Sequence, residues 1–465
     1  MSNSTELSTR TTAVKLVRRL KAAGYEAYFV GGCVRDQMLG QEPDDYDIAT
    51  SARPEEIEAL FPRTVPVGRK FGVMLVIEGE EQFQMATFRA EADYGDGRHP
   101  NRVTFSDARS DARRRDFTVN GLFFDPIEGR LHDWVGGEAD LRSRLVRTIG
   151  DPDERFGEDH LRLLRAARFG AQLNFTIEPR TLSAVRRHAP RILDVSGERI
   201  REELIKLFRP PHAARGLHLL RDCGLLDLIL PEIAATIDCE QSPEFHPEGS
   251  VYNHLARILE CLPADAPVSL VWSALLHDVG KPVTATRDVA TGQFHFYGHE
   301  KIGAEMAAGI LERLRFPRRQ IEEIVFCVRH HMQFKDVPRM RKSTLRRILM
   351  RPTFPLELEL HRLDCLGSHG SLAHYDYLME QAAQLDQEPG LRPPLITGRD
   401  LLALGMEPGP AMGRLLAQVR ERQLQDELKT PAQARVWARR QLQSEPATPG
   451  RGISANKPGR RKKRQ

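Results

Sequence analysis

A strand that ends in two glycines is the feature that most limits what this chain can fold into. Residues 26–30 have the composition of a β-strand, and Gly31 and Gly32 follow it directly. Because glycine lets the backbone turn sharply, amide donors at such a turn can approach a phosphate group closely. Arg35 adds a fixed positive charge beside the turn. We therefore predict a phosphate-binding cradle at the end of this strand.

Two acidic residues, Asp45 and Asp47, follow the glycine turn. Residues 45–49 are predicted to form a strand, in which side chains two residues apart leave the same face. Two carboxylates on one face suit Mg²⁺, which also takes oxygen ligands from water and from substrate phosphates. The alternative, an acidic pair at a solvated surface turn, is common. The glycines upstream favour the magnesium site, and a phosphate cradle beside two carboxylates is what nucleotidyl transfer requires.

The composition indicates an ordinary soluble protein of about three or four domains. The six cysteines show no Cys-x-x-Cys spacing, which argues against a zinc ribbon or a disulfide framework and favours a reducing cytoplasm. The longest apolar run, 268–276, is too short to cross a bilayer, so no membrane partner is expected. Nothing in the sequence sets the oligomeric state.

Basic residues gather locally, although the formal net charge is only +4. The tail from Lys457 to Arg464 contains no acidic residue and is predicted to be disordered. A solvated charge run and a nonspecific RNA contact are equally good interpretations of it.

The predicted secondary structure changes along the chain. Residues 73–77 and 82–88 are expected to pair as a hairpin, so that residues 26–135 form a small mixed sheet. Residues 231–249, rich in proline and acidic side chains, are interpreted as a linker to a further helical region that begins near Val251. Between the sheet and this linker, helical patterns predominate, at 155–173, 179–188, 197–208 and 212–222.

Further residues in the first half fit nucleotide binding. Residues 68–72 could bring basic side chains near phosphates, although the edge of a basic hairpin is an equally good interpretation. Residues 93–100 form a polar loop that could move during a reaction. The segment from Arg114 to Asn120, which contains Arg115 and Asp116, offers cations for a triphosphate and polar groups for a ribose.

In combination, these motifs resemble the class II tRNA nucleotidyltransferases, the CCA-adding family of the polymerase β superfamily, which also includes bacterial poly(A) polymerases. The resemblance extends over residues 12–222. It implies that Asp45 and Asp47 are the catalytic residues and bind two Mg²⁺, and that a tRNA 3′ end, CTP and ATP are the substrates. The nucleotide pocket that it implies is formed by Gly31, Gly32, Arg35, Asp36, Arg115, Asp116 and Asn120.

The same resemblance assigns selection of the incoming base to Asp159 and Arg162. Three residues apart on a helix, a carboxylate and a guanidinium can reach one base edge together. An ordinary surface ion pair is the alternative that the pair alone would favour. Arg165 and Arg168 complete the nucleotide-binding set, and residues 198–204 resemble a motif that braces the template helix.

Two positions depart from the family pattern. Gln84 stands where the family often carries a glutamate, so a third carboxylate ligand is not implied there. Gly121 replaces a usual alanine.

A second series of residues resembles the HD phosphohydrolase superfamily. The apolar run before the His-Asp dipeptide indicates that this dipeptide is held at the buried end of a helix. Imidazole and carboxylate ligands suit Mn²⁺, Fe, Ni²⁺ or Zn²⁺ better than Ca²⁺. Some members of the superfamily hydrolyse phosphoesters such as a 2′,3′-cyclic phosphate on damaged RNA, and a metal-free relic is the alternative. The resemblance implies the metal ligands His254, His277, Asp278 and Asp364, with His299 and His330 for a second metal or a substrate phosphate.

The segment 396–413 resembles the C-terminal part of the same nucleotidyltransferases. We expect a helix, a turn at Pro408-Gly409-Pro410 and a second helix. This segment favours tRNA over general polyadenylation.

We therefore expect an α+β protein in which a small mixed-sheet, polymerase-β-like nucleotidyltransferase head precedes an all-helical neck, body and tail. The expected domains are the head (12–150), the neck with the base template and RNA-binding helices (151–230), the HD domain (250–385), the C-terminal helices (395–445) and a basic disordered tail (446–465).

The expected function is template-independent addition of CCA to the tRNA 3′ end, with a metal-dependent phosphohydrolase activity as a further hypothesis. A poly(A) polymerase and an enzyme that adds only A or only CC remain alternatives. A protein that merely binds RNA or senses nucleotides, with the HD domain as its only working enzyme, is a third. The presence of Asp45, Asp47, Asp159 and Arg162 argues against it.

Overall fold

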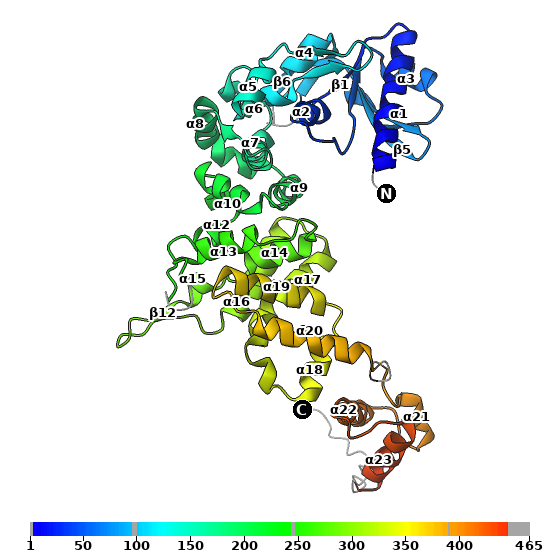
Figure 1. The fold of residues 1–465 in the computed structure, drawn as a ribbon, viewed down its shortest axis with the longest axis vertical. Coiled ribbons are helices and arrows are strands. Elements are labelled where there is room, and N and C mark those ends of the chain that lie inside the picture. Colours follow the sequence, from blue (N-terminus) through cyan, green and yellow to red (C-terminus); the bar gives the residue numbers. More distant parts are fainter. Residues whose placement is uncertain (1–2, 95–99, 243–246, 389–390, 392, 445–465) are drawn as a thin grey trace, which may run out of the picture. The chain divides into compact units, whose positions relative to one another are not determined.

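The computed structural model describes residues 3–94, 100–242, 247–388, 391 and 393–444. The chain divides into two compact units, Met1–Met332 with Glu359–Leu372, and Gln333–Leu358 with Ala373–Gln465. The expected fold class, a mixed-sheet head followed by helices, is confirmed (Figure 1). The basic tail at 446–465 and residues 95–99 of the expected mobile loop lie outside the described residues.

A seven-stranded mixed sheet forms the head, in the order β3-β4-β5-β2-β1-β8-β9. Only β2 and β5 pair parallel; the other neighbours pair antiparallel. The expected hairpin is confirmed, with Glu78 opposite Glu81. The strands are β1 (Ala27–Val30), β2 (Ile48–Thr50), β3 (Thr64–Gly68), β4 (Val73–Glu78), β5 (Glu81–Thr87), β8 (Phe123–Asp125) and β9 (Arg130–His132), and a separate hairpin pairs β6 (Arg89–Tyr94) with β7 (Pro100–Phe105).

One long helix and several short ones pack on this sheet, and their apolar sides contribute to the head's core. Leu16, Val17 and Leu20 of the first helix are buried, at the helical spacing seen in the sequence. The third helix begins at a proline, where a missing NH costs nothing, and Glu56 accepts from the backbone NH of Arg53. These helices are α1 (Asn3–Ala22), α2 (Gly32–Met38), α3 (Pro54–Leu60), α4 (Ala108–Arg113) and α5 (Gly137–Ser143), with 3₁₀ turns η1 (Arg69–Phe71) and η2 (Thr118–Asn120).

The neck is built around one almost fully buried helix, α7 (Leu161–Gln172). A Cβ on Gly170 would lie 3.0 Å from Leu219, so glycine here permits close helix packing. The single helix expected at 155–173 is wrong, because α6 ends at Glu158 and α7 starts at Leu161. The other neck elements are α6 (Pro152–Glu158), α8 (Pro179–His188), η3 (Ala189–Asp194), α9 (Gly197–Leu207), α10 (Ala213–Asp222) and the parallel strands β10 (Leu145–Val146) and β11 (Thr176–Ile177).

A further helical region completes the first unit. Its α14 is apolar on all sides and buried, which explains the apolar run in the sequence. A Cβ on Gly280 would lie 2.4 Å from the carbonyl oxygen of His299, so this glycine lets two helix ends meet closely. The elements are α11 (Leu226–Ile229), α12 (Pro231–Ala234), α13 (Val251–Glu260), α14 (Val268–Leu276), α15 (Lys281–Thr284), β12 (Thr286–Arg287), β13 (Phe294–His295), α16 (His299–Arg313), α17 (Arg318–His330), η4 (His331–Arg339) and α19 (Phe354–Gly367), of which η4 and α19 also contribute to the second unit.

In the described part of the second unit, the regular elements are all helices. The expected helix, turn and helix are confirmed, because α21 ends at Ala403 and α22 begins at Pro410. Leu401, Leu415 and Val419 pack in one apolar cluster of this unit. Its helices are α18 (Lys342–Leu349), α20 (Ala373–Asp386), α21 (Gly398–Ala403), α22 (Pro410–Leu424) and α23 (Pro431–Ser444).

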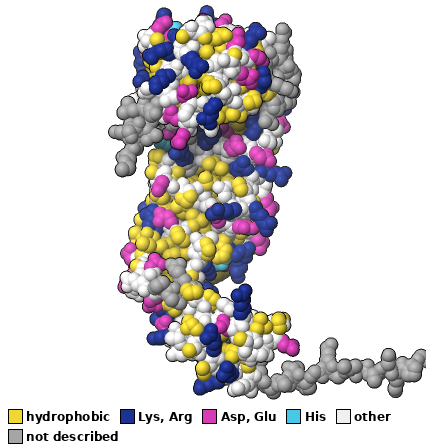
Figure 2. Space-filling model, turned by 90° about the vertical axis from the view of Figure 1, so that its right-hand side faces the viewer, with side chains coloured by type: hydrophobic (Ala, Val, Ile, Leu, Met, Phe, Trp, Pro, Cys, Tyr) yellow, Lys and Arg dark blue, Asp and Glu magenta, His cyan; other side chains and the backbone are white. Residues whose placement is uncertain are grey.

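The surface carries both charge signs, and on the face in Figure 2 acidic and basic side chains are interspersed. Among the described helices, none is long and apolar enough to span a lipid bilayer.

Candidate nucleotide site and metal centre

The predicted glycine turn lies between β1 and α2, in the wall of a cavity. Gly31 has a φ of +73°, a backbone conformation that favours glycine. A Cβ at this position would lie 3.0 Å from Nη1 of Arg115. The absence of a side chain therefore allows an arginine to approach the turn closely.

The two predicted carboxylates, Asp45 and Asp47, lie just before β2. The strand expected at 45–49 is wrong in its bounds, because pairing of β2 with β1 begins at Ile48. The backbone NH of Val30 nevertheless donates to the carbonyl oxygen of Asp47 at 3.1 Å, which holds this residue beside β1. Tyr46, between the two acids, is buried.

Burial and then the nearby charge of Asp45 raise the pKa of Asp47 to about 6, whereas Arg115 lowers it. The two carboxylates are therefore close enough to repel each other. A divalent cation bound by both would offset that repulsion, so the oxygen donors present fit Mg²⁺.

Residues from the head and the neck line one cavity of about 530 Å³. Arg114, from the segment expected to offer cations to the triphosphate, lines it as well, and so do Phe169 and Arg199, which the sequence interpretation had not placed in the pocket. Asp36 and Asp45 do not belong to its wall. The predicted residues in the wall are Gly31, Gly32, Arg35, Asp47, Arg115, Asp116, Asn120, Asp159, Arg162, Arg165 and Arg168.

Asp36 contacts the cavity through Arg35. Its carboxylate accepts from Nε of Arg35 at 2.8 Å, and Nη1 of the same guanidinium donates to Oδ1 of Asn120 at 2.7 Å. The ring of Phe169 lies 5.4 Å from this guanidinium and 4.0 Å from that of Arg168. Cations are thus held along the wall by a carboxylate, an amide and an aromatic face.

Asp116 is 7% exposed and anchors two other pocket residues. It accepts from Nε of Arg165 at 2.8 Å and from Nδ2 of Asn120 at 3.2 Å. Burial alone would raise the pKa of Asp116, but Arg165 and then Arg162 lower it to about 2. This carboxylate therefore stays charged and orients both neighbours.

The two residues expected to read the base do not share a helix. Asp159 follows α6 in an extended conformation, with φ −142° and ψ 107°, and its Oδ1 accepts from the NH of Leu161. Its carboxylate pairs with Arg199 at 3.1 Å. Arg162 lies on α7, where its guanidinium binds Glu158 and donates to the carbonyl oxygens of Arg155 (3.0 Å) and Arg114 (3.2 Å). Both side chains still face the same cavity.

The departures from the family pattern have local structural consequences. Gln84 lines the cavity, so an amide faces it where the family often has a carboxylate. A Cβ on Gly121 would lie 2.7 Å from Val135 and 3.0 Å from Ile149, so glycine matches the packing found here.

Arg69, from the basic segment 68–72, ion-pairs with Glu58 at 3.1 Å.

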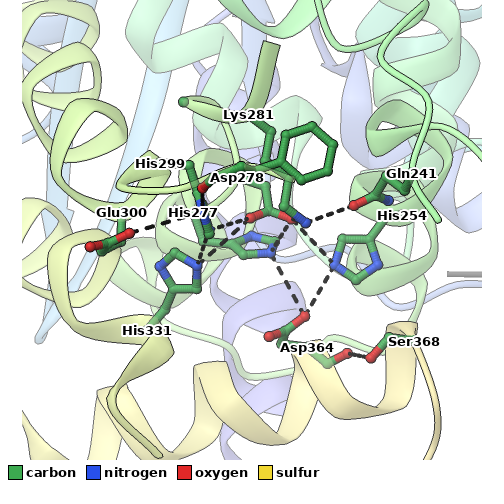
Figure 3. A network of polar contacts seen from close by, with 12 residues as sticks. Gln241, His254, His277, Asp278, Lys281, His299, Glu300, His331, Asp364 and Ser368 are labelled. Atoms are coloured by element: carbon green, nitrogen blue, oxygen red, sulfur yellow. Dashed lines mark hydrogen bonds and ion pairs between the residues drawn. The ribbon is translucent and has the colours of Figure 1, made fainter. Parts of the chain in front are cut away.

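A second cluster lies among α13, α14 and α19 (Figure 3). His254 is fully buried, and its Nε2 lies 3.1 Å from Oδ1 of Asp364 and 3.8 Å from Oδ2 of Asp278. Nε2 of His277 lies 3.3 Å from Oδ2 of Asp278. Ligand atoms of His254, His277 and Asp278 all lie within 4.8 Å of one another, so these residues could hold a metal. As expected, the His-Asp dipeptide directly follows the buried α14.

A second trio shares Asp278 with the first. Oδ1 of Asp278 lies 3.4 Å from Nε2 of His299 and 3.7 Å from Nε2 of His331. These three residues also meet the geometry of a metal site. The expected role of His330 is wrong: its ring stacks on Phe326 and its Nδ1 bonds the carbonyl oxygen of that residue at 2.8 Å. The histidine that faces the cluster is His331, the first residue after α17.

The interpreted linker at 231–249 supplies two side chains to this cluster. Glu248 lies 2.8 Å from Nδ1 of His254, and Gln241 accepts from Nζ of Lys281 at 2.6 Å. Lys281 in turn pairs with Asp278 at 2.7 Å. No spacing rule identifies Gln241 or Glu248 from the sequence, although Lys281 follows Asp278 at the helical spacing of three.

The charges of the cluster are tightly coupled. Burial lowers the pKa of His254, but hydrogen bonds with Asp364 and Glu248 outweigh it and raise that pKa to about 9. Burial and the neighbouring His277 lower the pKa of His331 to about 3. Buried carboxylates and imidazoles therefore stand together in a donor set that suits a transition metal.

Three family models match the chain. They are "Poly A polymerase head domain" over residues 27–147, "Probable RNA and SrmB- binding site of polymerase A" over 174–237, and "HD domain" over 250–361.

Several known proteins are similar over long stretches. An A-adding tRNA nucleotidyltransferase from Deinococcus radiodurans is 35% identical over 443 residues, which are 91% of this chain and 97% of that protein. A CCA-adding enzyme from Bacillus licheniformis is 46% identical over 214 residues, which are 46% of this chain and 54% of that enzyme. The alignment with this CCA-adding relative thus spans about half of its length.

The fold is also similar to that of a solved structure. A crystal structure of the Bacillus stearothermophilus CCA-adding enzyme in complex with CTP superposes with a TM-score of 0.70 at 26% identity. The match covers 93% of this chain and 97% of that one.

Proposed function

Because the chain belongs to the tRNA nucleotidyltransferase and poly(A) polymerase family and carries an HD domain, we propose that it adds CCA to the tRNA 3′ end. CTP and ATP are the nucleotide substrates, and Mg²⁺ is the metal at the head. The observation that carries this proposal is the single cavity in which Asp47 faces the arginines of the neck.

The reaction is attack of the RNA 3′-oxygen on the α-phosphorus of the bound nucleotide. A new P–O bond forms there, the bond to pyrophosphate breaks, and the hydroxyl proton leaves to solvent. Asp45 and Asp47 would hold Mg²⁺, which when bound favours deprotonation of the attacking hydroxyl and offsets the charge on the triphosphate.

The chain's own cations orient the triphosphate. Arg35, Arg115 and Arg165 lie in the cavity wall, and each is held by a carboxylate: Arg35 by Asp36, Arg115 by Asp111 and Arg165 by Asp116. Held side chains lose little freedom when the substrate arrives, so binding costs less. Gly31 and Gly32 leave room for the phosphates to approach the backbone.

Base selection rests on Asp159 and Arg162. A carboxylate accepts from an exocyclic amine and a guanidinium donates to a ring nitrogen or carbonyl, so the two together distinguish CTP from UTP, which has no exocyclic amine. Because both residues already have protein partners, the incoming base exchanges with those partners rather than meeting bare charges.

We place this activity in the cytoplasm, where tRNA and nucleoside triphosphates are available. The six cysteines, all of which lie in described residues, are free thiols, as a reducing compartment requires. The domain borders 12–150, 151–230, 250–385 and 395–445 are part of the same proposal.

Product sizes on two tRNA substrates test the proposal. With tRNA that lacks CCA, a CCA-adding enzyme extends the RNA by CC in CTP alone and by CCA in CTP with ATP. An enzyme that adds only A extends tRNA ending in CC but leaves tRNA without CC unchanged. A poly(A) polymerase makes long products in ATP alone, a result that would contradict CCA addition.

A second activity, hydrolysis of a phosphoester, is favoured by the two trios that share Asp278. Mn²⁺, Fe, Ni²⁺ or Zn²⁺ fits this buried histidine and carboxylate set. Metal analysis of the purified protein should find a transition metal that the combined variant His254→Ala and Asp364→Ala loses. Full metal content in that variant would place the metal elsewhere.

A further inference from the structure

A short arm is inserted between two elements of the His-Asp cluster. It consists of β12 and β13, paired antiparallel, with a turn in which Asp288 accepts from the NH groups of Ala290 and Thr291. In Figure 1 the arm projects away from the neighbouring helices. The arm follows α15, which begins at Lys281, and precedes α16, which begins at His299. The two helices that flank the arm therefore each carry a residue of the cluster, Lys281 on α15 and His299 on α16.

The end of this arm presents two stacked aromatic rings to solvent. The rings of His295 and Tyr297 are nearly parallel, at 13°, with centroids 5.4 Å apart, and Tyr297 is 80% exposed. A tyrosine ring as exposed as that of Tyr297 does not contribute to the core. Stacking on His295 holds the Tyr297 ring in one orientation, and the other face of the Tyr297 ring stays open to solvent.

Phe296, which lies between His295 and Tyr297, faces the opposite way. The ring of Phe296 lies 5.4 Å from Nζ of Lys281, and its carbonyl oxygen bonds Nδ1 of His299 at 2.7 Å. The alternation typical of extended backbone thus puts the stacked rings outside and attaches their backbone to the cluster. Tyr297 is two residues from His299, so their Cα atoms are at most about 7 Å apart.

We propose that His295 and Tyr297 form a stacking platform for an unpaired RNA base whose ribose phosphate enters the His-Asp cluster. A nucleotide carries a flat base and a charged phosphate on one ribose, which matches an aromatic face beside a cluster with a lysine and metal ligands. Arg287, whose guanidinium lies 5.5 Å from the Phe294 ring, adds a cation to the same arm. This inference rests on the hydrolytic activity proposed above.

The substrate class that this platform fits is a nucleotide or RNA end with a phosphoester on its ribose, for example a 2′,3′-cyclic phosphate. Water adds to phosphorus, one bond from phosphorus to a ribose oxygen breaks, and that oxygen takes a proton to become a hydroxyl. The products are a phosphate monoester and a free ribose hydroxyl, with no oxidant or second substrate. Stacking of the base affects how tightly the substrate binds and not how the bond breaks.

Hydrolysis by the full-length protein tests this assignment with two substrates, adenosine 2′,3′-cyclic phosphate and the base-free glycerol 1,2-cyclic phosphate. Tyr297→Ala should raise KM for the nucleotide by about tenfold or more, since base stacking on an aromatic ring contributes about 1–3 kcal/mol. The KM for the base-free ester should change less than about twofold. Tyr297→Phe, which keeps the ring, should restore the nucleotide KM. Val289→Ala, at a fully exposed aliphatic position on the same arm, is the matched control.

If Tyr297→Ala changes KM equally for both substrates, or for neither, the proposed role of His295 and Tyr297 as a stacking platform is wrong. If the wild-type protein hydrolyses neither ester, the proposed hydrolytic activity is wrong. Binding of a fluorescent nucleotide then tests the stacking platform on its own. The fluorescence of a 2-aminopurine nucleoside monophosphate should then be quenched by the wild-type protein and by Tyr297→Phe. Equal quenching by Tyr297→Ala would reject the platform.

Discussion

The carboxylate of Asp159 pairs with the guanidinium of Arg199 at 3.1 Å, although 40 residues separate them in the chain. Asp159 lies in the turn before α7 and Arg199 lies in α9, and both side chains line the nucleotide cavity. The proposed base reader is therefore held in place from a second helix. Arg199 acts as a positioning residue for Asp159.

Removing Arg199 should impair nucleotide selection. In Arg199→Ala the Asp159 carboxylate loses its ion-pair partner and keeps only the NH of Leu161, so it gains rotational freedom and correct and incorrect bases bind more equally. We expect the ratio of kcat/KM for CTP over UTP to fall about tenfold. The matched control is Arg187→Ala, which removes an exposed pair with Asp153 at 2.7 Å. Unchanged discrimination in Arg199→Ala would contradict the positioning role.

Asp116 should make the free energy of unfolding depend on pH in the acidic range. Its pKa is about 2 in the folded protein, below an unfolded value of about 3.9, so its ionised form stabilises the fold. That contribution is present above about pH 4 and is lost as the pH falls toward 2. In denaturant unfolding at pH 7, Asp116→Asn should be less stable by about 2 kcal/mol. The difference should shrink toward pH 3, and a constant difference would show that the ion pair with Arg165 is not its cause.

The sequence predicted those site features that depend on local spacing. The glycine turn after β1, the hairpin around Gly79 and the buried His-Asp dipeptide after α14 all follow from a few neighbouring residues. The break between α6 and α7 could not be predicted in this way, because the residues around Asp159 are compatible with one continuous helix. In the structure, the extended Asp159 accepts from the NH of Leu161 and pairs with the distant Arg199, a partner that local sequence does not identify.

Contacts between distant segments were also beyond sequence reasoning. Of two adjacent histidines, His331 faces the cluster and His330 does not, since the helix ends between them. Glu248 belongs to a segment whose proline and acidic content is typical of a linker, yet it contacts the buried His254. Neither composition nor periodicity carries information about such long-range contacts.

Glu248 should strengthen metal binding through His254. A carboxylate on Nδ1 fixes the imidazole so that Nε2 faces the other ligands, and loss of such a partner costs about 10–100-fold in metal affinity. Glu248→Ala should show that loss in a competition titration with a chelator, and Glu248→Gln, which keeps an acceptor, should show less. Glu240→Gln, at an exposed position in the same segment, is the control. Equal affinity in all four proteins would remove Glu248 from the site.

The two neighbouring histidines provide a matched pair of variants. His331→Ala removes a ligand of the second trio and should lower the metal content of the purified protein. His330→Ala removes a ring that stacks on Phe326 and should leave the metal content unchanged. Elemental analysis of both variants measures this difference, and the reverse pattern would restore the assignment made from the sequence.

Nucleotidyl transfer by the two carboxylates before β2 is the reaction proposed for the head. Its most direct test is incorporation of labelled CTP and ATP into tRNA without CCA by Asp45→Asn with Asp47→Asn, beside Glu42→Gln at an exposed neighbouring position. An unchanged unfolding transition and an unchanged metal content of the His-Asp cluster establish that the double variant is folded. We predict at least about a 10³-fold loss of incorporation in the double variant and none in the control. Undiminished incorporation by the folded double variant would contradict the account.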